Sequence, residues 1–260
     1  MKTTMLAIGC GLGVCLLLGA ANTAAAPGPC SNSILKGGYA FLYRNVGPLS
    51  SGVIQMGRLD SDGSGKFTEV FTSNQAGVTT HQTSTGTYTV NPDCSGTFVD
   101  TAIPGTQFVI LDAGDRVATV TTQFGVPASK TYTGQMQRIS LGNSTPCSDA
   151  SLKGVFFSVE DGVRAGNFGD IVFDVSVGNL TAFVADGAGS AVGRGIGTTE
   201  FSDVYTVNPD CTGSYDRRFV GGTFDEHADF VISGDGRMVY GVITDAGSGA
   251  VQIVAQKQDL

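Results

Sequence analysis

The heptapeptide YTVNPDC occupies residues 88–94 and occurs again, unchanged, at residues 205–211. Its first three residues alternate as the end of a β-strand does, with Tyr88 and Val90 on one face. The Asn-Pro-Asp-Cys that follows is typical of a type I turn, because Asn is favoured at the first position and Pro presets φ at the second. We therefore predict a structural role for this stretch, with a ligand contact by Tyr88 or Tyr205 as the alternative.

Other segments repeat in the same order along the chain. CSNSILKGGYAF (30–41) parallels CSDASLKGVFFS (147–158), and FVILDAGDRV (108–117) parallels FVISGDGRMV (230–239). A period of this length is that of a whole domain rather than of a solenoid unit. The sequence predicts one module at residues 27–140, a linker at 141–146 and a second module at 147–260.

The N-terminal segment, residues 1–26, has the pattern of a secretory signal peptide. Lys2 supplies the positive charge, an almost wholly apolar run extends from Met5 to Ala21, and ANTAAAP offers small residues for cleavage between residues 24 and 26. No later run is long and apolar enough for a membrane helix. We expect a protein that is secreted, or held in the periplasm or on the outer surface, with no membrane span after processing.

Four cysteines remain after processing, Cys30, Cys94, Cys147 and Cys211, with the same spacing in each module. An even number of cysteines in an exported protein indicates disulfides, and four allow three pairings. A module that duplicated was self-sufficient beforehand, which favours Cys30–Cys94 and Cys147–Cys211. A zinc site is disfavoured because the chain has no CxxC pair.

The composition indicates an all-β protein. Glycine accounts for 38 of the 260 residues, tryptophan is absent, and short β-branched and aromatic runs alternate with Gly, Asp, Asn and Ser clusters. The first module holds about eight such runs joined by short links, which predicts an up-and-down antiparallel barrel. A two-sheet β-sandwich is the alternative.

The pattern CS, then LKG with an aromatic two residues on, then YTVNPDCxG, resembles a group of exported bacterial proteins built from tandem modules. That resemblance covers both copies and implies no particular activity. Gly37-Gly38-Tyr39 and Gly154-Val155-Phe156 are also similar to the Gly-x-Trp opening of calycin barrels such as lipocalins and avidins, with allene oxide cyclases sharing the architecture. The second resemblance implies two calycin-like barrels.

The opening strand of each module is apolar on both faces, in GYAFLY (38–43) and in VFFSV (155–159). A strand with water on one side should alternate cleanly. Packing between the modules, a barrel interior that holds a small apolar ligand, and an exposed adhesive surface each explain the pattern. The candidate ligand-lining residues are Tyr39, Phe41, Tyr88, Phe156 and Tyr205.

Three functions follow from these alternatives. The first is a non-enzymatic secreted protein that binds a small apolar molecule inside one or both barrels. The second is a structural or adhesive cell-surface protein, and the third is a calycin-like enzyme, an isomerase, cyclase or hydrolase, using carboxylates at a barrel mouth. Enzymatic function is disfavoured, because the chain has no GxSxG motif and its cysteines are predicted to be bridged.

Charged residues give few further signals. The formal net charge of −8 disfavours nucleic acid and anionic lipid as partners. His81 lies in a polar stretch and is expected in a solvated loop. Asp225, His227 and Asp229 would share one strand face and form a weak candidate metal site, but the prediction is that the protein uses no metal or cofactor. The oligomeric state is left open.

Overall fold

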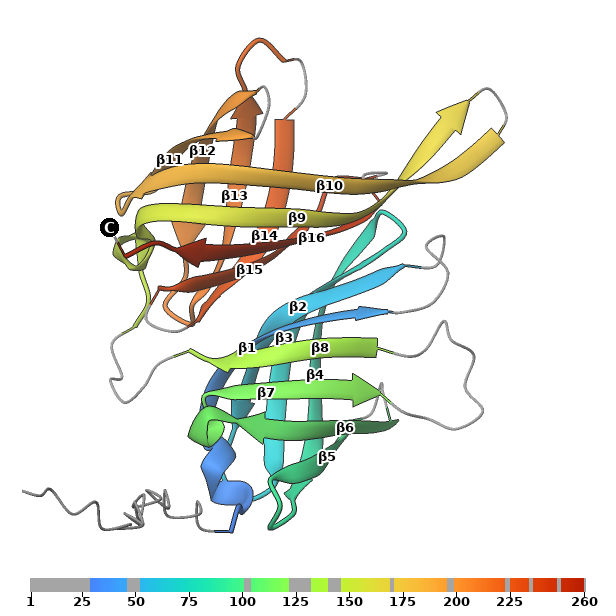
Figure 1. Cartoon of the computed structure of the whole chain (residues 1–260), viewed down its shortest axis with the longest axis vertical. Coiled ribbons are helices and arrows are strands. Elements are labelled where there is room, and N and C mark those ends of the chain that lie inside the picture. The colour runs from blue at the N-terminus through green and yellow to red at the C-terminus, as the bar shows by residue number, and fades with distance from the viewer. Residues whose placement is uncertain are drawn as a thin grey trace, which may run out of the picture.

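The computed structural model describes residues 29–45, 52–100, 104–121, 132–139, 146–168, 171–195, 199–222, 225–233, 236–246 and 249–259. The predicted signal peptide lies outside these residues. Among them, no helix is long and apolar enough to cross a membrane. The chain forms two closed antiparallel barrels whose strands follow one another in sequence order (Figure 1). This confirms the all-β fold and the barrel, and excludes the sandwich.

Each barrel contains eight of the described strands. The first is built from β1 (Gly37–Asn45), β2 (Val53–Ser61), β3 (Lys66–Gln75), β4 (Val78–Val90), β5 (Ser95–Asp100), β6 (Pro104–Leu111), β7 (Arg116–Thr121) and β8 (Tyr132–Arg138). The second is built from β9 (Lys153–Phe168), β10 (Ile171–Asp186), β11 (Ser190–Gly195), β12 (Glu200–Val207), β13 (Thr212–Phe219), β14 (Asp225–Ser233), β15 (Met238–Ile243) and β16 (Ala250–Lys257). Pairing of β8 with β1, and of β16 with β9, closes the two barrels.

The repeated heptapeptide forms the hairpin between β4 and β5. The amide of Cys94 donates to the carbonyl of Asn91 at 3.0 Å, and the amide of Asn91 donates to the carbonyl of Ser95 at 2.8 Å. The predicted type I turn is therefore present, and it is followed by a residue in the left-handed region, Cys94 with φ 68°. Glycine is usual at this bulge position. Cys211 repeats the conformation with φ 71°.

Disulfides join this hairpin to the start of each module, with the predicted pairing. Cys30 bonds to Cys94 and Cys147 to Cys211, and the Cα atoms are 5.0 Å apart in both bridges. The amide of Cys30 also donates to the carbonyl of Pro92, at 3.2 Å. Two disulfides fit a protein that folds in an oxidising, extracytoplasmic compartment.

The tyrosine of the heptapeptide anchors the segment that precedes the first strand. The hydroxyl of Tyr88 accepts a hydrogen bond from Ser61 (2.8 Å) and donates to the carbonyl of Asn32 (3.1 Å). In the second barrel, the hydroxyl of Tyr205 donates to the carbonyl of Leu152 at 3.0 Å. The seven residues recur because each module needs the same turn, bridge and anchor.

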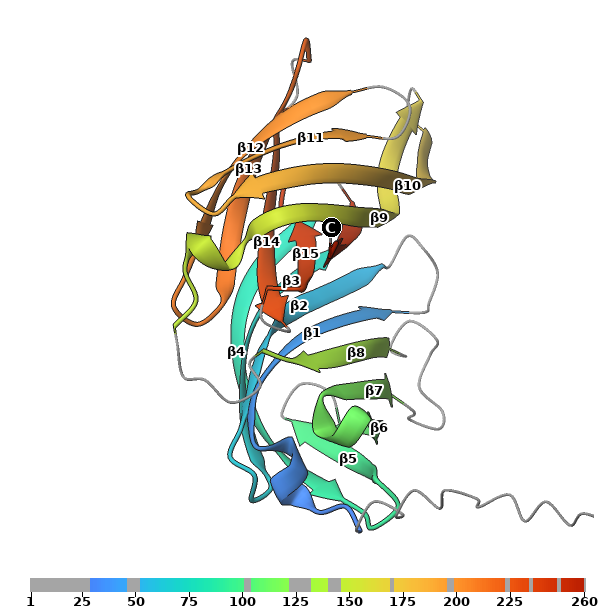
Figure 2. The same ribbon diagram turned by 60° about the vertical axis from the view of Figure 1, so that its left-hand side comes forward.

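The two barrels pack against each other through their outer walls. Contacts join β1, β2 and β3 to β14, β15 and β16 (Figure 2). The apolar part of this interface consists of Ala40, Leu42, Ile54, Met56, Val231, Tyr240 and Val242, all buried in one cluster that continues into the interior of the second barrel. Packing between the modules therefore explains why β1 is apolar on both faces.

Polar contacts set the register of this interface. Arg58 Nη1 donates to the carbonyl of Asp210 at 2.6 Å, and Asn74 Nδ2 donates to the carbonyl of Ile243 at 2.8 Å. Asp229 Oδ2 accepts from Thr72 at 2.7 Å and lies 2.8 Å from His81 Nε2. The expectation of a loop at His81 is wrong, because this residue lies within β4 and faces the second barrel.

The left-handed cysteine gives a test of how turn and bridge are coupled. Replacing Cys30 by Ser together with Cys94→Gly or Cys94→Ala removes the bridge, which costs about 4 kcal/mol on the chain-entropy model. Glycine tolerates positive φ, so the glycine version is expected to be more stable than the alanine version by about 1 kcal/mol. Urea denaturation of both double variants measures the difference. Equal stabilities would show that the turn relaxes once the bridge is gone.

Candidate functional site

The interior of the first barrel is apolar at its disulfide end and polar toward the opposite end. The buried core comprises Leu35, Tyr39, Phe41, Leu59, Phe67, Phe71, Tyr88, Phe98, Phe108, Val117 and Met136, among others. Phe67 and Phe98 meet edge to face with ring centroids 5.4 Å apart, and Phe98 and Phe108 pack at 4.4 Å. Above these rings the inward positions of β1, β3 and β5 carry Tyr43, Glu69 and Asp100.

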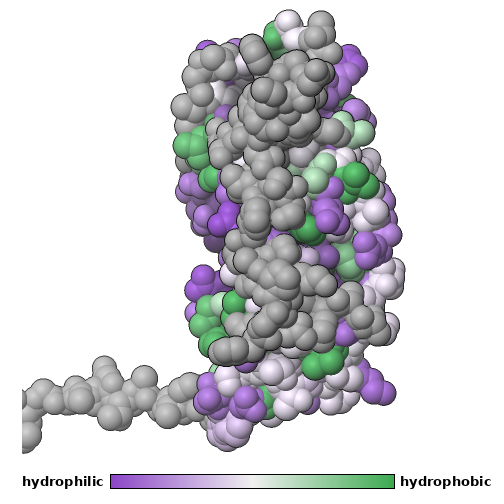
Figure 3. Space-filling model, turned by 90° about the vertical axis from the view of Figure 1, so that its right-hand side faces the viewer, coloured by the Kyte–Doolittle hydropathy of each residue, from purple (hydrophilic) through white to green (hydrophobic). Residues whose placement is uncertain are grey.

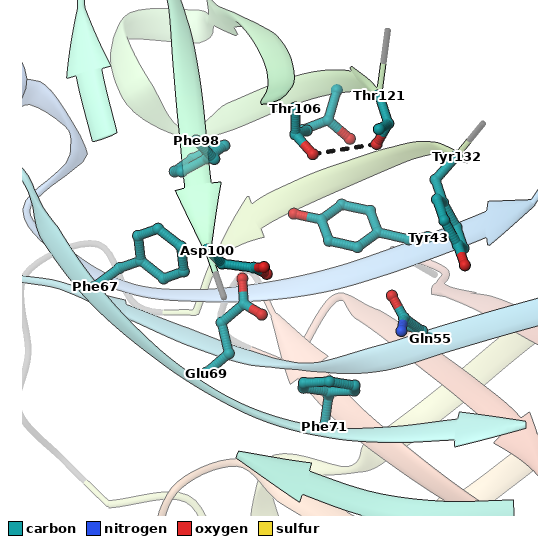
Figure 4. A pocket seen from close by; sticks show the side chains of 11 residues that line it. Tyr43, Gln55, Phe67, Glu69, Phe71, Phe98, Asp100, Thr106, Thr121 and Tyr132 are labelled. Atoms are coloured by element: carbon teal, nitrogen blue, oxygen red, sulfur yellow. Dashed lines mark hydrogen bonds between the residues drawn. The ribbon is translucent and has the colours of Figure 1, made fainter. Parts of the chain in front are cut away.

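A small cavity lies among these polar groups (Figure 4). It is lined by Tyr43, Gln55, Phe67, Glu69, Phe71, Phe98, Asp100, Thr106, Thr119, Thr121 and Tyr132. Its volume is about 30 Å³, which holds roughly one or two water molecules. Pockets for small-molecule ligands usually measure about 300 Å³ or more, so the described cavity is an order of magnitude too small for one.

Glu69 is the chemically distinctive group of this cavity. Burial, and then the neighbouring charge of Asp100, raise the pKa of Glu69 to about 7, although a hydrogen bond from Ser84 (3.2 Å) opposes the shift. Figure 4 shows the two carboxyl groups pointing toward each other, with the Tyr43 hydroxyl directed at them. Burial, Glu69 and Asp100 also raise the pKa of Tyr43 well above its ordinary value. The cavity thus contains a carboxyl group that changes its charge near neutral pH.

The second barrel has a different interior at the equivalent depth, where a buried arginine replaces the carboxylate of Asp100. Asp100 ends GTFVD (96–100), and Arg217 ends the parallel GSYDR (213–217). Arg217 Nε and Nη2 donate to the two carboxylate oxygens of Asp203, at 3.0 and 3.2 Å. Its Nη1 donates to Glu160 at 2.7 Å and lies 3.3 Å from Glu226.

Aromatic rings complete the surroundings of this arginine. Its guanidinium carbon lies 3.9 Å from the centroid of the Phe201 ring and 4.9 Å from that of Tyr215. All three acidic partners are at most 6% exposed at their side chains. Such a cluster is stable only while its charges remain paired, and these side chains occupy the interior of the second barrel at this depth.

The five residues predicted from the sequence to line a ligand site are all buried in the barrel cores: Tyr39, Phe41, Tyr88, Phe156 and Tyr205. Tyr39 donates from its hydroxyl to the carbonyl of Gly114 at 2.8 Å, which fixes it against the barrel end. The residues around the cavity are other ones. A ligand contact by any of the five stays a prediction.

Glu69 could have been found from the sequence. In KFTEVF (66–71), Phe67, Glu69 and Phe71 fall on one face of the strand, so a carboxyl group between two inward phenylalanines must be buried. Arg217 gave a weaker signal, because its acidic partners lie on three other strands. No local pattern brings these four charges together.

The weak candidate metal ligands lie on the outer face of β14, each with its own contacts. Asp225 is 3.6 Å from Arg218, and Asp229 contacts the first barrel. His227 Nδ1 lies 2.6 Å from Asp245 Oδ1, a hydrogen bond that raises the pKa of His227. Within the described part of the chain, no group of three acidic, histidine or cysteine side chains is arranged to hold a metal ion.

Comparisons with known proteins add little. No family model matches the chain, and no curated protein matches it. Among solved structures, the apo crystal structure of the haemoglobin receptor HpuA from Kingella denitrificans aligns over 90% of this chain and 91% of its own, at 9% identity and a TM-score of 0.34. A similarity of this degree carries no argument about function.

The raised pKa of Glu69 predicts that stability falls with pH. The folded chain holds the proton of Glu69 more tightly than the unfolded chain does, so stability declines as the pH rises from about 4.5 to about 7. The difference corresponds to about 3 kcal/mol. Glu69→Gln is expected to be more stable than the wild type at pH 8 by up to this amount, and nearly equal to it at pH 4.

Urea denaturation at the two pH values measures this effect, with Glu200→Gln, an exposed change on β12, as the control. If the free energy of unfolding of Glu69→Gln depended on pH just as that of the wild type does, Glu69 would already be ionised at pH 5 in the folded protein.

Arg217 and Arg218 are adjacent on β13 and give a matched pair. The side chain of Arg217 is 3% exposed and that of Arg218 is 79% exposed. Arg217→Met leaves three buried carboxylates without their cation and is expected to cost about 3–5 kcal/mol at pH 7. Arg218→Met is expected to change stability by less than about 0.5 kcal/mol. Similar losses in the two variants, measured by urea denaturation, would contradict the structural role given to Arg217.

Proposed function

We propose that the chain is an exported, non-enzymatic surface protein with a structural or adhesive role, and that it acts through the outer faces of its two barrels. The observation that carries this proposal is that both interiors are occupied at the described residues. Aromatic side chains fill the first barrel and leave about 30 Å³. In the second barrel, Arg217 and its acidic partners occupy the interior.

An apolar ligand in the first barrel is disfavoured by chemistry as well as by size. The cavity is lined by Glu69, Asp100 and several hydroxyl groups, beside the rings of Phe67, Phe71 and Phe98. An apolar molecule placed there would remove water from polar groups without replacing their hydrogen bonds, which is unfavourable. The carboxyl and hydroxyl groups of the lining therefore fit water molecules better than a lipid-like ligand.

The outer faces, in contrast, carry apolar side chains that a purely solvated barrel would not need. Large exposed apolar residues are Val70, Val78, Val99, Val109, Leu111, Phe157, Val159, Leu180, Val184, Val192, Val204 and Val220. Figure 3 shows one side of the molecule, on which hydrophobic and hydrophilic residues are interspersed over both barrels. Where exposed apolar residues are contiguous, they mark interaction surfaces.

Enzymatic function has one observation in its favour. A carboxyl group with a pKa of about 7 suits general acid or base catalysis near neutral pH. Tyr43 and Asp100 lie beside Glu69 and could position a reacting water. The cavity admits nothing larger than water, however, so this remains the second candidate.

Two measurements on protein purified from its own host test the proposal. Native mass spectrometry is expected to show the processed chain with two disulfides and no retained small molecule. Fluorescently labelled protein is expected to bind saturably to the envelope of the producing cells, and Glu69→Gln is expected to bind equally well. A small molecule retained at one per chain, or loss of envelope binding in Glu69→Gln, would overturn the proposal in favour of an interior site.

A further inference from the structure

The interface between the two barrels joins two different faces of the same fold. We define face A as the outer side of the first two strands of a barrel, β1 and β2 or β9 and β10. Face B is the outer side of the sixth and seventh strands, β6 and β7 or β14 and β15. Within the chain, face A of the first barrel packs on face B of the second. The contact is therefore heterologous. Apart from Asp161 of β9, which Arg44 of the first barrel contacts at 3.2 Å, it leaves face A of the second barrel and face B of the first uncovered by the chain's described residues.

The uncovered face A is strongly apolar. Phe157 and Val159 of β9 repeat the positions of Ala40 and Leu42, and they are 52% and 48% exposed. Leu180 of β10 pairs with Val159, as Met56 pairs with Leu42 in the first barrel, and it is 50% exposed. The side chains that would be buried in an interface of the internal kind are thus present, and Phe157 is much larger than its counterpart Ala40.

The same face continues onto the next strand. Val184 of β10 pairs with Val192 of β11, and both are exposed. Apolar side chains on three neighbouring strands form one continuous surface rather than scattered residues. A surface of this kind is typical of a contact site.

The uncovered face B is its counterpart. Val109 of β6 repeats Val231, which is fully buried in the internal interface, yet Val109 is 47% exposed. Ala118 and Val120 of β7 repeat Tyr240 and Val242. Because alanine replaces the tyrosine that projects from the second barrel, this face is hollowed. A groove of about 470 Å³ crosses Val109, Ala118 and Val120, and it could receive a ring such as that of Phe157.

We infer that the partner of this chain is a second copy of itself. Face A of the second barrel in one copy docks on face B of the first barrel in the next, which repeats the internal interface from chain to chain. This inference rests on the proposed structural role and names its partner. Since each addition leaves one face A and one face B free, the copies assemble head to tail into an open chain or a ring.

The contact between copies is apolar and weaker than the internal one. Arg58 donates to the carbonyl of Asp210 across the internal interface. The equivalent position on the free face A of the second barrel is Ala182. Asp229 accepts a hydrogen bond from Thr72 in the internal interface. The equivalent position on the free face B of the first barrel is Gln107. Two of the polar contacts that fix the internal register therefore have no counterpart between copies. Assembly should be reversible, should rise with protein concentration and should respond little to salt.

Sedimentation velocity of the processed chain over a range of concentrations tests the inference. The wild type is expected to form species beyond the dimer as concentration rises. Phe157→Lys blocks face A and Val109→Lys blocks face B, so each is expected to weaken association at least tenfold. Val220→Lys, an exposed change on neither face, is expected to behave as the wild type and controls for added charge.

The mixture of the two blocked variants gives the decisive outcome. Val109→Lys keeps face A and Phe157→Lys keeps face B, so an equimolar mixture is expected to form a one-to-one dimer that grows no further. A wild type that stays monomeric, or a mixture with no dimer although both variants keep wild-type thermal stability, would overturn the inference. If the labelled protein still binds the cell envelope in that case, the proposed surface function stands and only self-assembly fails.

Discussion

Each barrel depends on one covalent constraint, the disulfide between the segment before its first strand and the hairpin after its fourth. The bridge joins the segment before β1 to the hairpin between β4 and β5. It therefore holds the first strand of the module close to the fourth and fifth strands of the same barrel. The cysteine of that hairpin adopts a backbone conformation that glycine would adopt more easily. The module thus accepts local strain at Cys94 and Cys211, and the bridge offsets it by restricting the unfolded chain.

The two barrels share one fold but neutralise the buried charged groups of their interiors in different ways. In the first barrel, two carboxyl groups share a water-sized space, and one of them is held near its protonated form. In the second, an arginine stands at the equivalent position and three acids surround it. Buried charge is costly unless it is neutralised or paired, and the duplicated copies have each taken one of these routes. Both routes leave the described interior positions occupied by side chains.

Much of the fold could be predicted from the sequence because its signals are local or repeated. The type I turn at Asn91–Cys94 follows from the heptapeptide alone, and the disulfide pairing follows from the repetition of whole modules along the chain. The sequence predicted a loop at His81 instead of the beginning of β4, since residues 78–83 are largely exposed on both faces and therefore show no alternation of apolar and polar residues. The position of Glu69 between Phe67 and Phe71 on one face of a strand indicates a buried carboxyl group. The Arg217 cluster had none, because its members meet only when four separate strands close into a barrel.

The short connection between the barrels also raises the effective concentration of one barrel near the other. Because β8 ends at Arg138 and β9 begins at Lys153, the two halves of one polypeptide meet at a high effective concentration, and their mutual contact forms whatever the abundance of the protein. Contacts between separate polypeptides have no such tether. They depend on the local concentration of the protein, so a surface where copies accumulate would favour them and a dilute solution would not.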